Sequence, residues 1–265
     1  GFKCFTGDVA DFLFSRQRTK GWGFDVEILH LAALEGLMIF EMPISWHYRE
    51  DSKIRANRDS IAMLREVILV KWRSQRGIYK HKPSTQWAPY KTNSIPNLDH
   101  LDGQVAIVVP TYNEASNLPA LIKRIFLLGI PNMRVIIVDD GSPDRTSSVA
   151  KNLAARYVGQ IFVVQRPCKQ GVGTAYREGF SKALAEGARY VLQMDADLSH
   201  PPECIPYMLE SLKESEVSVG SRYVEGGRMA HRWGHWRRLL SFLGNWGIRA
   251  VAGIETRDAT SGFKA

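Results

Sequence analysis

Two aspartates, Asp195 and Asp197, stand two positions apart at the end of an apolar run in "YVLQMDADLSH". Alternate residues of an extended segment point the same way, so both carboxylates can face one cation. Mg²⁺ and Mn²⁺ prefer hard oxygen ligands and leave room for water and substrate phosphates. An acidic pair alone fits a solvated turn equally well. Its position after a buried strand favours a metal site that holds a diphosphate.

The segments that would position these aspartates alternate between short apolar runs and helical periodicity. Strands are predicted at 105–110, 134–140, 160–165 and 190–197, and helices at 116–129, 143–157 and 173–187. This alternation predicts an α/β fold with a mostly parallel sheet and helices on both faces. Ligands of such sheets bind at the carboxyl ends of the strands. The polar clusters "PTYNE", "DDGSPD" and "MDADLSHPPE" are therefore expected to meet at one edge.

The composition limits the classes of function. Hydrophobic residues make up 45% of the 265 residues, enough for a core, and the net charge of +8 suits an anionic partner. A nucleic-acid-binding protein is one alternative, but no helix-turn-helix, zinc or RNP signature is present. A P-loop is excluded because GxxxxGK[ST] is missing. Three cysteines without a CxxC pair argue for a reducing compartment rather than a disulfide framework.

No apolar run reaches the roughly 18–20 residues that span a bilayer. The most apolar candidate, "ILHLAALEGLMIF", is interrupted by His30 and Glu35 and is predicted as a helix that runs into a strand. Neither a transmembrane segment nor a signal peptide is therefore expected in this chain.

Six motifs occur in order across 104–265: "VVPTYNEASNLPALI", "VIIVDDGSPDRT", "GVGTAYREGF", "QMDADLSHPPE", "VGSRYVEGG" and "DATSGFK". This region resembles family 2 glycosyltransferases with the Rossmann-like GT-A fold, in particular the dolichyl- and polyprenyl-phosphate mannose synthases. The resemblance implies an inverting hexosyltransferase that moves mannose from GDP-mannose to a polyprenyl or dolichyl phosphate. It implies Mg²⁺ or Mn²⁺ as cofactor and a peripheral position at the cytoplasmic face of a membrane.

The same resemblance assigns contacts with the nucleotide-sugar donor to residues at three strand ends: Pro110, Tyr112, Glu114, Asp139, Asp140, Asp195, Ala196 and Asp197. Asp195 and Asp197 would hold the metal on the diphosphate. Some relatives carry Gln at the position of Ser199, so this shorter side chain is a third candidate ligand, acting through water.

Contacts with the acceptor are implied by "GSRY" and by "HWRRLLSFLGNWGIRAVAG". In the family, an Arg of "GSRY" and an Arg-x-x-x-Ser pair bind the lipid phosphate, and Arg222, Arg237 and Ser241 match those positions. The longer segment is predicted as an amphipathic helix, suited either to a membrane interface or to packing on the sheet. A phosphate acceptor is largely anionic at neutral pH, so no general base is required and direct displacement predicts inversion.

Residues 1–76 resemble the carboxyl-terminal third of a related polyprenyl-phosphate glucosyltransferase domain. Residues 77–103 are predicted as a linker, and 104–265 as the amino-terminal two-thirds of such a domain. The tripeptide "GFK" occurs near both ends of the chain. A window from a tandem fusion explains this repeat, as does one circularly permuted transferase. The duplicated seam favours the window.

Basic residues of the first block are further candidates for the acceptor phosphate: Lys3, Arg49 and Lys53. In "GFDVEIL", Asp25 is left open between a donor contact and a helix-start residue, whereas Glu27 is predicted to be structural. The first block also leaves UDP-glucose open as the donor. A family 2 transferase that acts on a soluble acceptor is a further alternative.

Overall fold

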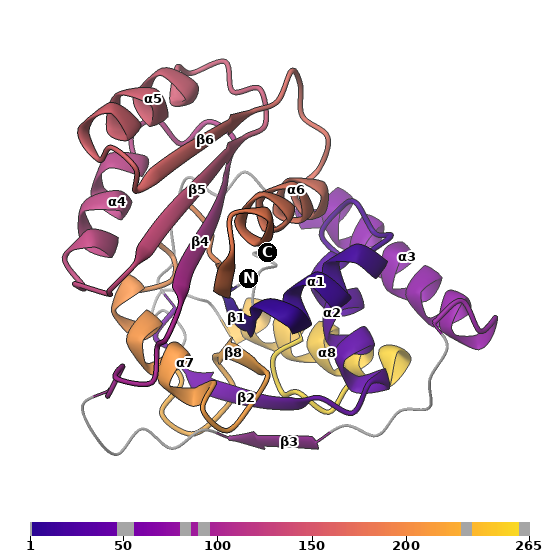
Figure 1. Ribbon diagram of the computed structural model, residues 1–265. Coiled ribbons are helices and arrows are strands. Elements are labelled where there is room, and N and C mark those ends of the chain that lie inside the picture. Colours follow the sequence, from indigo (N-terminus) through magenta and orange to yellow (C-terminus); the bar gives the residue numbers. More distant parts are fainter. Residues whose placement is uncertain (1, 47–55, 80–85, 90–95, 229–234, 260–265) are drawn as a thin grey trace.

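The centre of the molecule is one sheet of eight strands (Figure 1). The strands are β1 (Lys3–Thr6), β2 (Met38–Pro43), β3 (Gln86–Pro89), β4 (Gln104–Thr111), β5 (Met133–Asp139), β6 (Ile161–Gln165), β7 (Ala188–Gln193) and β8 (Val217–Ser221). Their order across the sheet is β3-β2-β8-β1-β7-β4-β5-β6. The computed structural model describes residues 2–46, 56–79, 86–89, 96–228 and 235–259, without the side chains of 56–61, 86–89 and 235–243.

The strands are parallel except for β1, which pairs antiparallel with both β7 and β8. The first residue of β1, Lys3, is paired with Gln193 at the last position of β7. Therefore the amino end of β1 and the carboxyl ends of its neighbours share one edge. The predicted α/β class with a mostly parallel sheet is confirmed.

Helices cover both faces of the sheet, because each face is apolar and must be buried. One layer holds α1 (Gly7–Arg16), α2 (Phe24–Leu34), α3 (Ala56–Gln75), α6 (Val172–Ala185) and α8 (His235–Ala252). The other layer holds α4 (Leu118–Phe126), α5 (Thr146–Arg156), the 3₁₀ turn Pro202–Cys204 and α7 (Ile205–Ser211). Among the described residues, no helix is long and apolar enough to cross a membrane.

Most predicted elements of 104–265 are found close to their expected limits, with two differences that concern function. The strand predicted at 190–197 ends at Gln193, so Asp195 and Asp197 lie in the turn that follows rather than on an extended segment. The argument from alternating side chains therefore does not apply to them. Within the segment predicted as a linker, Gln86–Pro89 form a strand that pairs with β2.

The N-terminal block is built into the same sheet as the rest of the chain. Its strand β1 lies between β7 and β8, and its strand β2 lies on the other side of β8. The helices of this block, α1, α2 and α3, lie in the same layer as α6 (Figure 1). Residues far apart in the sequence are thereby neighbours at the sheet edge.

A glycine sets the distance between α6 and the sheet. A methyl group at Gly179 would lie 2.3 Å from Cγ1 of Val108 and 3.1 Å from Cγ2 of Val138. We expect Gly179→Ala to lower the free energy of unfolding by about 1–3 kcal/mol, because the helix must move off β4 and β5. Gly244→Ala is the matched control, since nothing lies within 4 Å of that position in α8. Gly244→Ala should raise the free energy of unfolding by about 0.5–1 kcal/mol, as measured by urea unfolding. Equal changes in the free energy of unfolding for the two variants would contradict this packing.

Candidate active site

Polar side chains from six strands meet at one edge of the sheet. They stand at the ends of β4, β5, β6, β7 and β8 and at the start of β1: Thr111, Asp139, Arg166, Asp195, Arg222 and Lys3. The convergence predicted from the strand ends is thus present, and β1 adds to it because it runs in the opposite direction. Most of these groups are buried, and each has a polar partner from the protein, so these partners decide what each group can do.

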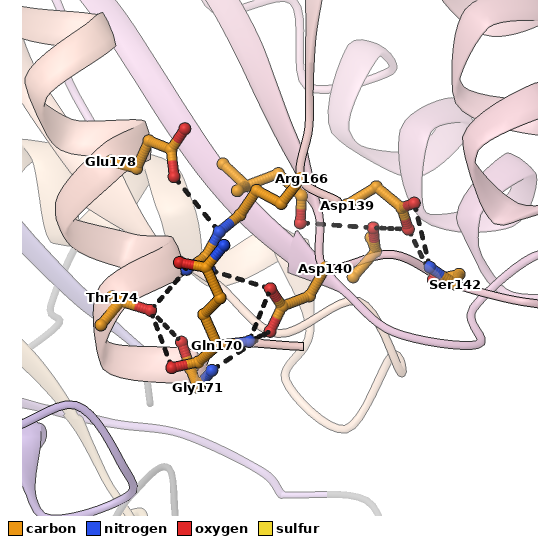
Figure 2. A network of polar contacts seen from close by, with 10 residues as sticks. Asp139, Asp140, Ser142, Arg166, Gln170, Gly171, Thr174 and Glu178 are labelled. Atoms are coloured by element: carbon orange, nitrogen blue, oxygen red, sulfur yellow. Dashed lines mark hydrogen bonds and ion pairs between the residues drawn. The ribbon is translucent and has the colours of Figure 1, made fainter. Parts of the chain in front are cut away.

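Asp139, the last residue of β5, is fully buried, and hydrogen bonds hold its carboxylate. Its Oδ1 accepts from Thr111 Oγ1 at 3.1 Å and from Ser142 Oγ at 2.5 Å, and its Oδ2 accepts from the Ser142 amide at 3.2 Å. These bonds fix the turn after β5 against the end of β4. The carboxylate of Asp139 is therefore held in place at the end of β5 (Figure 2).

Asp140 faces the loop that leads into α6. Its carboxylate lies 3.0 Å from Nη1 of Arg166 and accepts from the amides of Gln170, at 3.2 Å, and Gly171, at 3.3 Å. Nη2 of Arg166 donates to Gln170 Oε1 at 2.9 Å and to Thr174 Oγ1 at 2.7 Å. Figure 2 shows these groups joined in one network of polar contacts. Asp140 therefore orders the entry to α6, and its predicted contact with a nucleotide stays a prediction.

The Asp-x-Asp pair lies immediately beyond β7. Oδ1 of Asp195 accepts from the phenol of Tyr176 at 3.0 Å, and its Oδ2 lies 3.9 Å from Nδ1 of His200. Asp197 Oδ1 accepts from the amide of Ser199 at 3.1 Å. The Ser199 hydroxyl is fully buried and lies 3.2 Å from Nδ1 of His200, which gives it a partner other than a metal.

Tyr176 is a fixed donor to the acidic pair. Burial, followed by the negative charge of Asp195, raises the pKa of Tyr176 well above its ordinary value. Its phenol therefore keeps its proton at neutral pH and holds one oxygen of Asp195. The ring stacks on Phe24 at the start of α2, with centroids 5.2 Å apart, so the N-terminal block packs directly against this residue.

Lys3 and Asp25 form a buried ion pair of 2.7 Å between β1 and the first turn of α2. Asp25 also accepts from Nε2 of Gln193, at 2.7 Å. Burial, the largest influence, would raise the pKa of Asp25. The charge of Lys3 and the hydrogen bonds from Lys3 and Gln193 contribute to a pKa that nevertheless lies below its ordinary value. The structure thus gives the Nζ of Lys3 a protein partner, and its predicted contact with an acceptor phosphate stays a prediction.

Arg222 is buried in a two-pronged contact with Asp258. Nε donates to Oδ2 at 2.8 Å and Nη2 to Oδ1 at 2.9 Å, while the Arg222 amide also donates to Oδ2 at 3.0 Å. Burial opposes the charge of Asp258, but Arg222 lowers the pKa of this carboxyl below its ordinary value. The contact with Asp258 engages Nε and Nη2 of the guanidinium.

The remaining predicted donor residues lie around the end of β4. The ammonium of Lys169 lies over the ring of Tyr112, 4.1 Å from its centroid. Glu114 accepts a hydrogen bond from Nδ2 of Asn117 at 2.7 Å. Pro110 is half-buried within β4. Ala196, between the two aspartates, is buried.

Two predicted acceptor residues lie on α8 and two lie outside the described residues. Arg237 and Ser241 are one turn apart in the helix, which places them on the same side of it. Their side chains are outside the described part of the structure, as are Arg49 and Lys53 altogether.

Glu27 has the structural role expected for it. Its fully buried carboxylate accepts from the amides of Arg18, at 3.0 Å, and Thr19, at 2.6 Å, and from the phenol of Tyr79. Arg73 of α3 lies 3.7 Å away. Glu27 thus joins the loop before α2 to the end of α3.

The sequence interpretation missed several residues that hold the site together: Glu41, Arg166, Tyr176, Gln193 and Asp258. Two of them carried a readable signal. Arg166 directly follows the third predicted strand, where strand-end reasoning would have placed it in the site. Glu41 is a carboxylate inside the apolar run "MIFEMP", a costly position unless it has partners.

Two carboxylates at a strand end fit a divalent cation that is completed by water and by ligand phosphates. Asp195 and Asp197 supply such oxygens. Among the described residues, no cluster of three or more His, Cys, Asp or Glu side chains could hold a metal without other ligands. Asp195 and Asp197 are the residues that would hold such a cation.

Three known proteins that are similar to this chain have related names. The polyprenol monophosphomannose synthase of Mycolicibacterium smegmatis is 38% identical over 161 residues, which cover 60% of each chain. The undecaprenyl-phosphate mannosyltransferase of Micrococcus luteus is 37% identical over 61% of this chain and 65% of its own length. The dolichol-phosphate mannosyltransferase of Pyrococcus furiosus is 39% identical over 61% of this chain and 46% of its own length. The chain thus spans about half to two-thirds of each of these relatives.

A solved structure, a mannosyltransferase from Pyrobaculum calidifontis in complex with GDP-Man and Mn²⁺, overlaps this chain in part. The overlap covers 52% of this chain and 38% of that one, with 24% identity and a TM-score of 0.33. The family model that describes glycosyl transferase family 2 matches residues 106–265. Because that match covers more than half of the sequence, the chain belongs to glycosyl transferase family 2.

Proposed function

We propose that this chain transfers mannose from GDP-mannose to a polyprenyl phosphate, with inversion at the anomeric carbon. The observation that carries this proposal is the set of three relatives, 37–39% identical, that are all named for mannosyl transfer to a prenyl phosphate. The acidic strand ends at one edge of the sheet support it. The basic residues Arg222 and Lys3 at the same edge support it as well.

The donor half of the site would lie over the ends of β4, β5 and β7. Asp195 and Asp197 would hold the divalent cation, which stabilises negative charge on a departing nucleoside diphosphate when it is bound. Tyr176 keeps Asp195 oriented by its hydrogen bond of 3.0 Å. Asp139, which is fixed by the turn after β5, would contact the base and ribose.

The acceptor half would lie near β8 and α8. One phosphate oxygen of the acceptor attacks the anomeric carbon while the bond to the diphosphate breaks on the opposite side. This phosphate is already largely deprotonated near pH 7, because its second pKa is about 6, so no side chain has to remove a proton. Arg222, Arg237 and Ser241 would hold the phosphate in line for this attack.

A membrane surface is the proposed location, because α3 and α8 expose large apolar side chains. On α3, Leu64, Ile68 and Trp72 recur every fourth residue and are 50%, 53% and 47% exposed. Trp246 on the neighbouring helix α8 is 62% exposed. Apolar side chains flanked by basic residues suit the interface of an anionic bilayer. The free cysteines suit its cytoplasmic side.

We expect Trp72→Glu to weaken binding to vesicles of phosphatidylcholine and phosphatidylglycerol by about tenfold, since burying such a side chain stabilises by roughly 1.5–3 kcal/mol. Leu127→Glu is the control, because Leu127 is 74% exposed at the end of α4 in the other helix layer. Vesicle co-sedimentation measures both. Equal losses for the two variants would contradict docking through α3.

The test of the proposed activity is product formation from GDP-mannose and undecaprenyl phosphate in the presence of Mn²⁺. We expect a lipid-linked mannose whose anomeric configuration is inverted, and no product when EDTA is added. UDP-glucose in place of GDP-mannose tests the alternative donor. Retention of configuration would contradict direct displacement. Sugar transfer only to a soluble acceptor would contradict the lipid phosphate as substrate.

A further inference from the structure

A buried carboxylate of the N-terminal block anchors the segment that follows α8. Glu41, in the middle of β2, is fully buried. Its Oε2 accepts from the amide of Arg257 at 2.8 Å, and its Oε1 accepts from the amide of Asp258 at 2.9 Å. Two consecutive amides bound by one carboxylate fix the orientation of the peptide plane between them. The side chain of Asp258 is thereby aimed at Arg222.

A second residue holds the same segment from α8. Nδ2 of Asn245 donates to the carbonyl of Arg257, and its Oδ1 accepts from the amide of Ala259 at 3.1 Å. Residues 257–259 are thus bound on one side by β2 and on the other by α8. Strand, segment and helix form a rigid frame around the ion pair of Arg222 and Asp258.

This arrangement is more specific than sheet stability needs. An apolar side chain at position 41 would pack in the core without the cost of burying a carboxylate. Burial, the largest influence, raises the pKa of Glu41, which means that removing this carboxylate from water disfavours its charged form. The benefit has to lie in what the carboxylate binds, and its two bonded amides lead directly to Asp258.

We propose that Glu41 is a positioning residue for Arg222, acting through Asp258. The inference rests on the proposed function, in which Arg222 contacts the acceptor phosphate. Asp258 engages Nε and Nη2, so it fixes the plane of the guanidinium and the direction of Nη1. A guanidinium binds phosphate well only in the right plane, because its N–H groups are fixed in a fork. The N-terminal block is therefore part of the acceptor half of the site.

The first arm of the test does not depend on activity. In Glu41→Gln, one of the two amides would face an NH₂ group instead of an acceptor, so the segment 257–259 should loosen. We expect the Nε–H signal of Arg222 in NMR spectra, which the ion pair protects from exchange, to exchange at least about tenfold faster. Glu216→Gln is the matched control, because Glu216 accepts from the Met38 amide at 2.8 Å at the opposite end of β2. An unchanged Arg222 signal in Glu41→Gln would overturn the proposal.

The second arm measures turnover. We expect Glu41→Gln to raise KM for polyprenyl phosphate by about tenfold or more and to leave KM for the sugar nucleotide near that of Glu216→Gln. Asp258→Asn, which keeps the shape of the side chain, should give the same split and serves if Glu41→Gln does not fold. Equal rises in both KM values would show a general loss of structure and overturn the positioning role. If the unmodified chain transfers no sugar, the proposed function fails, while the NMR arm still decides whether Glu41 positions Arg222.

Discussion

Asp197→Ala is expected to lower kcat/KM for sugar transfer by at least about a hundredfold. A carboxylate that holds a divalent cation on a diphosphate contributes several kcal/mol to the transition state, and each 1.36 kcal/mol is a factor of about ten. Asp195→Ala should have a similar effect, and it also removes the acceptor of the hydrogen bond from Tyr176. The measurement is the initial rate with GDP-mannose at several concentrations of Mn²⁺.

Two comparisons make this result specific to the cation. Asp99→Ala removes an exposed carboxylate from a loop far along the chain from β7 and should leave the rate unchanged. Asp197→Ala should also lose the dependence of GDP-mannose binding on Mn²⁺. If Asp197→Ala binds the donor with unaltered Mn²⁺ dependence, then the cation does not lie on this pair.

Lys3→Met is expected to lower the free energy of unfolding by about 3–5 kcal/mol, because it leaves Asp25 as a buried charge without its cation. Lys3 is fully buried in its 2.7 Å pair with Asp25. The double variant Lys3→Met with Asp25→Leu should recover most of the loss, since neither charge then remains. Urea unfolding measures all three proteins.

The control is the ion pair between Arg189 and Asp102. Nη1 of Arg189 lies 2.8 Å from Oδ2 of Asp102, and the two side chains are 62% and 58% exposed. Arg189→Met should cost at most about 1 kcal/mol, because solvent screens such pairs. A similar loss for Lys3→Met and Arg189→Met would contradict a buried pair.

The pH dependence of stability has a defined sign for the Lys3–Asp25 pair. The pKa of Asp25 in the folded chain lies below its ordinary value. The stabilisation is therefore complete above the ordinary pKa of about 3.9 and is lost as the pH falls toward the folded value. Lys3→Met should weaken this acid dependence.

The sequence by itself predicted the strands and helices between 105 and 197, the amphipathic helix that is α8, and the α/β class, whereas α7 and β8 were not predicted. Apolar runs such as "VAIVVP" and "RVIIVDD" are typical of strands buried on both faces, and the helices between them favour parallel pairing. Parallel pairing brings the acidic ends of β4, β5 and β7 to one edge, whatever the side chains then do. The Asp-x-Asp pair and the strand end at Asp139 were predictable for this reason.

Only the tertiary structure decided which partners these groups have. The antiparallel insertion of β1 between β7 and β8 brings Lys3 to the active edge, and no local pattern encodes that neighbour. The pairings of Lys3 with Asp25 and of Arg222 with Asp258 join residues 22 and 36 positions apart. Glu41 binds amides 216 and 217 positions away. Such contacts depend on how the whole chain is routed, because a buried charge takes whichever partner the topology places beside it.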